Sequence, residues 1–221
     1  MGPPGAGKGT QANSIAARFG VPAVSTGDIF RSLQTADTPL AVRVRGIMAA
    51  GGYVDDETTN AIVAERLAAA DCRNGFLLDG YPRTLRQVDT LDELLAATGH
   101  GVDAVLCLQA GEDELVERLL HRGHVQGRVD DTQDTIRTRL GVYAEQTAPL
   151  LDTYRQRGLL TEVDGLGEVA TVSDRIHQAL TRAESPSSLA YLPQRKSTSW
   201  PHPARDTPSP FASSPLPSRA P

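Results

Sequence analysis

The sequence is poor in aromatic residues and in cysteine. Phe, Trp and Tyr make up 5% of the 221 residues, and the only cysteines are Cys72 and Cys107. The separation of these two fits no metal-binding spacing, which argues against a zinc-binding or disulfide-rich protein. Both lie beside apolar segments, so we expect reduced core residues in a cytoplasmic protein.

Long apolar runs and an excess of basic charge are also absent. No segment is apolar over the length that a membrane-spanning helix needs, and nothing near Met1 resembles a signal peptide. The formal net charge is −5, whereas nucleic-acid-binding proteins usually carry a basic surface. We therefore expect a globular protein that binds neither membranes nor nucleic acid.

Residues 185–221 differ in composition from the rest of the chain. They hold nine of the 15 prolines, and their four basic residues and one acid give +3, which leaves −8 for residues 1–184. Such a segment buries too little apolar surface to offset the entropy lost on ordering. We therefore predict one domain over residues 1–184, followed by a disordered Pro/Ser-rich tail.

A glycine-rich run at residues 2–10, Gly-Pro-Pro-Gly-Ala-Gly-Lys-Gly-Thr, predicts a phosphate-binding loop. Glycines let backbone N–H groups approach an anion, and the helix that follows adds the positive end of its dipole. Lys8 would reach the outer phosphates of a nucleotide. The generic pattern has a hydroxyl directly after the lysine, but here Gly9 precedes Thr10. The alternative is a Gly/Pro turn that only caps a helix.

Residues 1–184 alternate between helical and strand patterns, which predicts an α/β fold with a three-layer arrangement of a parallel sheet and flanking helices. Helices are predicted at 8–19, from 28, at 39–48, from 55, and at 84–98, 112–122, 132–157 (with a kink at Pro149) and 169–183. Strands are predicted at 22–25, 76–78, 102–108 and 159–163. Only Met1 precedes the loop, so we expect its leading strand to be missing and the native protein to start upstream.

Further polar clusters follow predicted strands or flank a loop, where open parallel sheets bind ligands. They are Ser25-Thr26-Gly27-Asp28 with Arg31, Asp79-Gly80-Tyr81-Pro82-Arg83 with Gln87, and Arg118, Arg122, Arg128 and Arg139 around a loop at 123–131. Phosphoryl transfer depends on positioning and fixed positive charge, and arginine grips two phosphate oxygens at once. Arg43, Arg45 and Arg66 lie outside these clusters, and we interpret them as surface residues.

These motifs, in this order over residues 2–182, resemble those of the short-lid adenylate kinases. The matching segments are 2–10, 25–28, 77–83 and 127–131 with Arg139. The resemblance implies a P-loop nucleoside monophosphate kinase fold, with an AMP-binding helical segment at 25–54 and a lid at 122–132. It implies a monomeric cytoplasmic enzyme that transfers the terminal phosphoryl group of ATP to AMP, giving two ADP for adenine nucleotide homeostasis.

The resemblance also implies roles for residues on the ATP side. The phosphates would be bound by Gly5, Ala6, Gly7, Lys8, Gly9 and Thr10. The ATP base would contact Arg118 and the backbone of Gly167. Asp79 would hold Mg²⁺ through water, with a weaker contribution from Thr10. The catalytic set would be Lys8, Arg83, Arg122, Arg128 and Arg139.

On the AMP side the implied residues line one pocket. They are Thr26, Arg31, Gly52, Tyr53, Val54, Gly80, Tyr81, Pro82, Arg83 and Gln87. Thr26 and Gln87 would contact the adenine, and Arg31 and Arg83 the phosphate.

The predicted lid contains no cysteine, so we expect no structural zinc, in contrast to some long-lid relatives. Gly123 and Gly127 are the expected flexible points. Asp130 and Asp131 fit two compatible roles, as N-caps of the helix predicted from Thr132 or as parts of a functional lid.

Three other interpretations stay open at this point. A UMP/CMP kinase of the same superfamily would share these motifs, although Thr26 and Gln87 favour adenine. An inactive nucleotide-binding module and a fragment that does not fold would both follow from loss of the first strand.

The only tryptophan, Trp200, lies in the predicted tail. During urea denaturation we expect its emission maximum to stay nearly constant, because the indole is already in water, while far-UV circular dichroism shows a cooperative transition. An emission change that follows the dichroism would contradict the prediction of a disordered tail.

Overall fold

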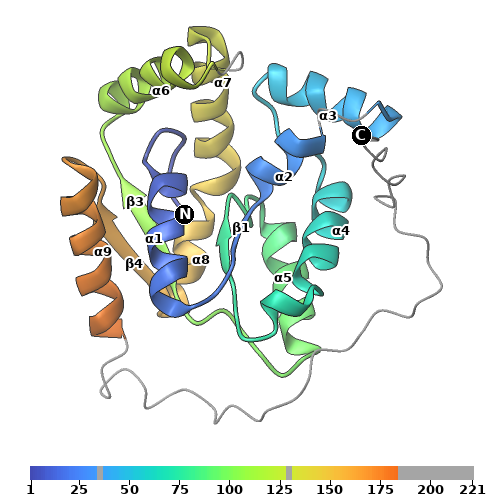
Figure 1. The fold of residues 1–221 in the computed structure, drawn as a ribbon, viewed down its shortest axis with the longest axis vertical. Helices are drawn as coiled ribbons and strands as arrows, with labels where there is room; N and C mark the ends of the chain where they lie inside the picture. Colours follow the sequence, from blue (N-terminus) through green and yellow to red (C-terminus); the bar gives the residue numbers. More distant parts are fainter. Residues whose placement is uncertain (34–36, 128–130, 184–221) are drawn as a thin grey trace, which may run out of the picture.

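The computed structural model describes residues 1–33, 37–127 and 131–183 (Figure 1). The predicted tail, Arg128 and Asp130 lie outside these residues. The strands are β1 (Ala23–Ser25), β2 (Leu77–Asp79), β3 (Val105–Gln109) and β4 (Leu160–Asp164). The helices are α1 (Lys8–Phe19), α2 (Thr26–Leu33), α3 (Pro39–Ala49), α4 (Asp56–Leu67), α5 (Leu85–Ala96), α6 (Glu112–Gln126), α7 (Gln133–Val142), α8 (Leu150–Gln156) and α9 (Val169–Ala183). A 3₁₀ turn, η1 (Ala70–Cys72), and a π-helical turn, η2 (Tyr143–Thr147), complete the set.

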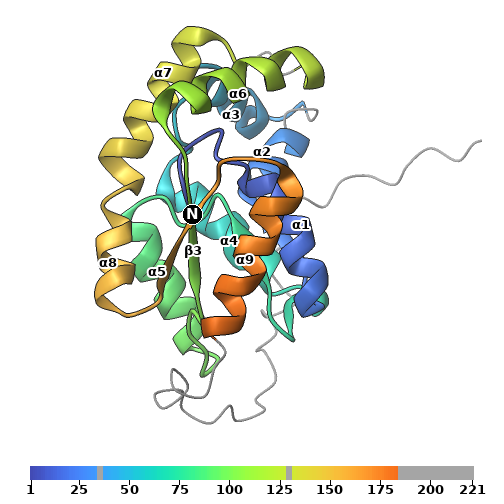
Figure 2. The same cartoon turned by 90° about the vertical axis from the view of Figure 1, so that its left-hand side faces the viewer.

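Helices cover both faces of the strands, which confirms the predicted three-layer α/β architecture (Figure 2). On one face, Ile15 of α1 and Ile176 of α9 pack against Leu108 and Val163 of β3 and β4. On the other face, α5 and α8 pack against β3, and Tyr154 of α8 is fully buried there. The helices from α2 to α4 form a separate apolar cluster of their own.

The strands form two parallel pairs in place of the single predicted sheet. β1 pairs with β2, and β3 pairs with β4. Within the described ranges no strand bonds to both β2 and β3. Met1 alone makes strand-like bonds there, because its amino group donates to the Leu106 carbonyl and its carbonyl accepts from Leu108 N at 3.1 Å.

Two helix boundaries beside the site differ from the sequence prediction. α2 begins at Thr26 instead of residue 28, and α6 continues to Gln126 instead of ending at 122. Gly123 therefore lies inside a helix, whereas Gly127 ends it in the left-handed conformation with φ of 62°.

The kink predicted at Pro149 is replaced by the π-helical turn η2 just before it. There Ala148 N donates to the Tyr143 carbonyl at 2.9 Å, a longer-range bond than the α-helical one. Because proline lacks an N–H, the α-helical hydrogen-bond pattern is interrupted at Pro149. The π-helical turn accommodates this interruption before α8 begins.

No helix in the described part of the chain has both the length and the apolar character required to cross a membrane.

Extending the chain before Met1 with about five apolar residues should raise its thermal midpoint, because an added strand can hydrogen-bond to β3 and extend toward β2. Burial, and then the like charge of Lys8, lowers the pKa of the Met1 amine from 8.0 to about 6. Between these values the unfolded chain binds more protons, so the original chain should lose stability from pH 8 to pH 6. The extended chain should lack this loss, and thermal unfolding followed by circular dichroism measures both effects.

A Gly/Ser extension of the same length is the matched control, because it removes the free amine at Met1 but forms strands poorly. It should remove the pH-dependent loss without raising the midpoint measured above pH 8, where the amine is neutral in both states. Equal midpoints for the two extensions would contradict the pairing argument.

Candidate active site

The predicted phosphate-binding loop leads into α1 and leaves the start of this helix open. Gly5 and Gly7 have φ of 85° and 90°, and a Cβ on Gly5 would lie 2.8 Å from the Leu115 carbonyl oxygen. No side chain caps α1, and its first turn contains no acidic residue. Its first N–H groups and the positive end of its dipole are therefore available to an anion.

Lys8 lies half-buried against the loop that precedes it. Its Nζ donates to the carbonyls of Gly2 and Pro3 at 2.7 and 2.8 Å. Burial lowers the pKa of Lys8 to about 8; the opposite charge of Asp79 raises it, and the like charges of Arg83 and Arg122 lower it further. The ammonium group thus stands among other cations, with neutral carbonyls as its hydrogen-bond partners.

Asp79 and Thr10 offer oxygen ligands that fit the expected magnesium ion. Asp79 ends β2, and a Cβ on Gly9 would lie 3.6 Å from its Oδ2, so the carboxylate faces the first turn of α1. Thr10 is exposed in that turn. Among the described residues no three His, Cys, Asp or Glu side chains gather in one place, and Mg²⁺ with ATP needs only one or two protein groups in addition to phosphates and water.

Arg83 is a second cation without a carboxylate partner in the described residues. Its Nε donates to the Gly80 carbonyl at 2.6 Å, and its guanidinium lies 4.6 Å from the centroid of the Tyr53 ring. Burial lowers the pKa of Arg83, and the like charges of Arg139 and Arg31 act in the same direction. The terminal nitrogens of the guanidinium make no hydrogen bond within the described residues and can bind a ligand.

Asp131 joins two arginines of the predicted catalytic set. Its fully buried carboxylate accepts from Arg122 Nε and Nη2 at 2.7 and 2.8 Å and from Arg139 Nη1 at 2.8 Å. The N-cap role expected for Asp131 is wrong, because Thr132 caps α7 by accepting from Thr135 N. The carboxylate instead positions two guanidinium groups, one from α6 and one from α7. The three groups together carry one net positive charge.

Arg118 lies where the strand pair β3–β4 meets α9. Its Nη1 donates to the Gly165 carbonyl at 2.9 Å, and its Nε pairs with Glu114 at 2.7 Å. Gly167 follows with φ of 103°, exposed and with open space around its Cα. Arg118 and Gly167 are therefore close in space, as their expected shared contact with a base requires.

The residues expected around AMP gather at the carboxyl ends of β1 and β2, but several of their side chains already make hydrogen bonds within the protein. Thr26 and Gln87 are each 1% exposed. Thr26 Oγ1 donates to the Gly80 carbonyl at 2.9 Å. Gln87 accepts from Arg83 N at 2.8 Å and donates to Asp56 Oδ1 at 2.7 Å.

The side chains of Arg31 and Tyr81 also have partners within the protein. Arg31 pairs with Asp28 on the same turn of α2. The Tyr81 side chain packs in the core with Val24 and Leu67, so only its backbone faces the site. Because Gln87 is almost fully buried, contact between its side chain and a base would require neighbouring groups to move.

Sequence reasoning missed residues that hold the site together. Asp56 accepts hydrogen bonds from Gln87 and Thr84, and Thr147 links Tyr53 to Arg83. Their hydroxyl and carboxylate groups act through other residues, so no motif marks them. The two adjacent acids at 55–56, at the predicted start of a helix, were the one available signal, and Asp55 caps that helix.

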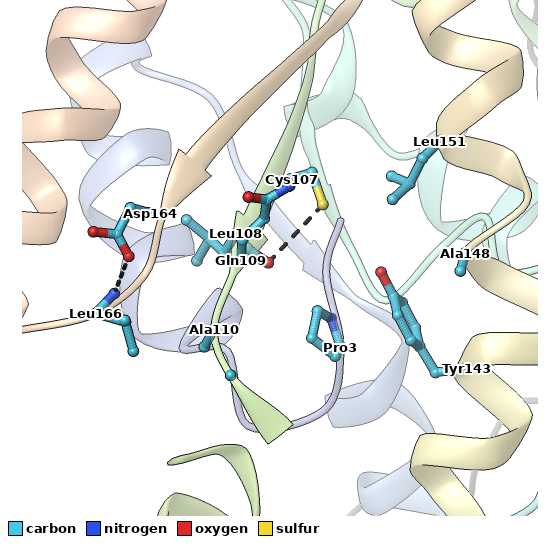
Figure 3. A pocket seen from close by; sticks show the side chains of 11 residues that line it. Pro3, Cys107, Leu108, Gln109, Ala110, Tyr143, Ala148, Leu151, Asp164 and Leu166 are labelled. Carbon is cyan, nitrogen blue, oxygen red and sulfur yellow. Dashed lines mark hydrogen bonds between the residues drawn. The ribbon is translucent and has the colours of Figure 1, made fainter. Parts of the chain in front are cut away.

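A cavity of about 580 Å³ lies beside the loop, between β3 and the helices that follow α7 (Figure 3). Pro3, Cys107, Tyr143 and Leu151 border it. Burial raises the pKa of the Cys107 thiol. None of the residues predicted to bind phosphate lines this cavity, so it does not mark the nucleotide site.

Comparison with known proteins gives one consistent match. The sequence model described as adenylate kinase matches residues 1–159. A protein named adenylate kinase from Nocardioides sp. is 58% identical over 180 residues, which cover 81% of this chain and 94% of the relative. Another, from Clavibacter michiganensis subsp. michiganensis, is 56% identical over 191 residues, which cover 86% of this chain and 96% of the relative.

A third relative with the same name, from Thermobifida fusca, is 50% identical over 180 residues, covering 81% of this chain and 95% of the relative. The family match includes the loop, the end of β2 and both arginines that pair with Asp131. The chain therefore belongs to the adenylate kinase family.

Proposed function

We propose that this chain catalyses the reversible transfer of the terminal phosphoryl group of ATP to AMP, giving two ADP. The observation that supports this most directly is the pair of half-buried cations, Lys8 and Arg83, which lack carboxylate partners among the described residues. Burying like charges near one another is unfavourable unless an anion joins them. A polyphosphate that spans the loop and the end of β2 supplies that anion.

The donor nucleotide takes the side of the loop. The open start of α1, Lys8 and the glycine-rich backbone bind the phosphates of ATP, and Arg118 with the Gly165–Gly167 turn contacts its base. The acceptor takes the opposite side, where Arg83 and Arg31 bind the AMP phosphate. The relatives' name, adenylate kinase, favours AMP over UMP or CMP as acceptor.

The reaction needs alignment and charge more than covalent chemistry. An oxygen of the AMP phosphate forms a bond to the γ-phosphorus of ATP, and the bond from that phosphorus to the β,γ-bridging oxygen breaks. Lys8, Arg83, Arg122, Arg128 and Arg139 stabilise the charge on the oxygens during transfer. Asp79 and Thr10 would hold Mg²⁺, which supplies further positive charge to the donor phosphates when it is bound.

Asp131 has a defined part in this scheme. In the described structure it neutralises part of the charge of Arg122 and Arg139 and orients both. Phosphate oxygens become additional acceptors for these guanidinium groups, whose five N–H donors exceed what one carboxylate uses. Exclusion of water by the lid prevents hydrolysis of ATP, the competing reaction.

We also propose that the enzyme is cytoplasmic and monomeric.

An inactive nucleotide-binding module is the main competing proposal. It would gain thermal stability from ATP through linkage but would form no ADP. Coupled detection of ADP from ATP and AMP distinguishes the two, and CMP and UMP serve as alternative acceptors in the same assay.

Arg83→Ala should lower kcat/KM by orders of magnitude while leaving the unfolding midpoint nearly unchanged. Its charge contacts a phosphate, and removing it also relieves repulsion from Arg139 and Arg31. Arg43→Ala is the matched control, because its one ion pair among the described residues is an exposed pair with Asp55. Steady-state kinetics should show an almost unchanged control, and equal losses in both variants would contradict the assignment of the site.

Raising the pH from 7 to 9 should weaken ATP binding. Lys8 has a pKa of about 8, so its charge is lost over this range, and each pH unit above 8 should cost up to about tenfold in affinity. Lys8→Met should bind ATP weakly at pH 7 and show no such decline. Calorimetric titration tests this, and a wild-type affinity that is equal at both pH values would refute it.

A further inference from the structure

A buried threonine in η2 contacts two parts of the proposed acceptor site. Thr147 is 5% exposed, and its Oγ1 donates to the Arg83 carbonyl at 3.0 Å. The same oxygen lies 3.1 Å from the hydroxyl of Tyr53, which precedes α4. One side chain thus connects three segments that are far apart in the sequence.

The direction of these two hydrogen bonds follows from the available protons. The Arg83 carbonyl can only accept, so it takes the single hydroxyl proton of Thr147. The Thr147 oxygen must then act as the acceptor toward Tyr53, and the Tyr53 phenol is the donor. The chain of bonds runs from Tyr53 through Thr147 to the backbone of Arg83.

The Tyr53 ring orients the Arg83 side chain. The guanidinium lies over the ring at 4.6 Å from its centroid, a cation–π contact, and Nε donates to the Gly80 carbonyl. The ring fixes one face of the guanidinium, and Gly80 fixes one edge. Thr147 fixes both the ring and the backbone from which the side chain extends.

The π-helical turn determines where the Thr147 hydroxyl points. α7, which carries Arg139, continues through η2 into α8. An extra residue in the turn rotates everything after it by about 100° relative to a regular α-helix. Thr147 is the last residue of that turn, and there its hydroxyl contacts both Tyr53 and Arg83.

We propose that Thr147 and Tyr53 are positioning residues that set the orientation of Arg83 toward the acceptor phosphate. The inference rests on the function proposed above. The hydrogen bonds of Thr147 connect the segment that follows the helix of Arg139 to the loop of Arg83. Two arginines from different elements thereby face one phosphoryl group. Neither hydroxyl needs to touch substrate for this effect.

The first test is steady-state kinetics on Thr147→Val, with Thr147→Ser as the conservative variant. Valine keeps the shape but removes the hydroxyl, so kcat/KM for AMP should fall about tenfold, mainly through KM, while the Kd for ATP alone stays unchanged. Thr147→Ser keeps the hydroxyl and should therefore retain most of the wild-type kcat/KM for AMP. Thr138→Val in α7 is the matched control, since this exposed hydroxyl bonds only within its own helix, to Asp134.

The second test uses Tyr53→Phe, which removes the phenol proton but keeps the ring under Arg83. If the two hydroxyls act as one unit, Tyr53→Phe and Thr147→Val should together cost about as much as the larger single effect. This pair also decides the question if Thr147→Val alone folds poorly, because Tyr53→Phe tests the same chain of bonds.

The outcomes separate this inference from the proposed function. A wild-type chain that forms no ADP from ATP and AMP overturns the function. An active wild type with Thr147→Val and Tyr53→Phe at wild-type KM for AMP overturns the positioning role alone. Additive losses in the double variant would indicate two independent structural effects and would also overturn it.

Discussion

Positive charge held half-buried without a carboxylate partner among the described residues is the constraint on which the site depends. Lys8 and Arg83 are bound to carbonyl oxygens and an aromatic ring, groups that orient a cation but do not neutralise it. Such charges cost folding free energy, and the apolar clusters on both faces of the strands must offset that cost. A bound polyphosphate removes the cost, so the arrangement favours binding of an anion at the expense of stability.

The arginines of the site fall into two classes by their partners. Arg31, Arg118, Arg122 and Arg139 are paired with carboxylates in the described structure, whereas Arg83 is not. A carboxylate partner keeps a side chain ordered and lowers its net charge until substrate arrives. Asp131 does this for two arginines from different helices, so a single carboxylate organises the arginine pair borne by α6 and α7.

Much of the fold could be predicted because it depends on residue types and spacings within short segments of the sequence. The loop at residues 2–10, the strand ends at Asp79 and Ser25, and the Asp55 cap are all readable from residue types and spacing. The division into two strand pairs was not predicted, because it depends on which strand bonds to which. The π-helical turn before Pro149 and the burial of Gln87 depend likewise on long-range packing, which no window of sequence contains.

The most direct measurement of the central claim is calorimetric titration with a bisubstrate ligand, two adenosines joined by a five-phosphate chain. If one pocket of cations aligns two nucleotides, one molecule should bind per chain, far more tightly than ATP, and its binding should exclude both ATP and AMP. Binding no tighter than that of ATP, or continued binding of AMP alongside the ligand, would contradict the account.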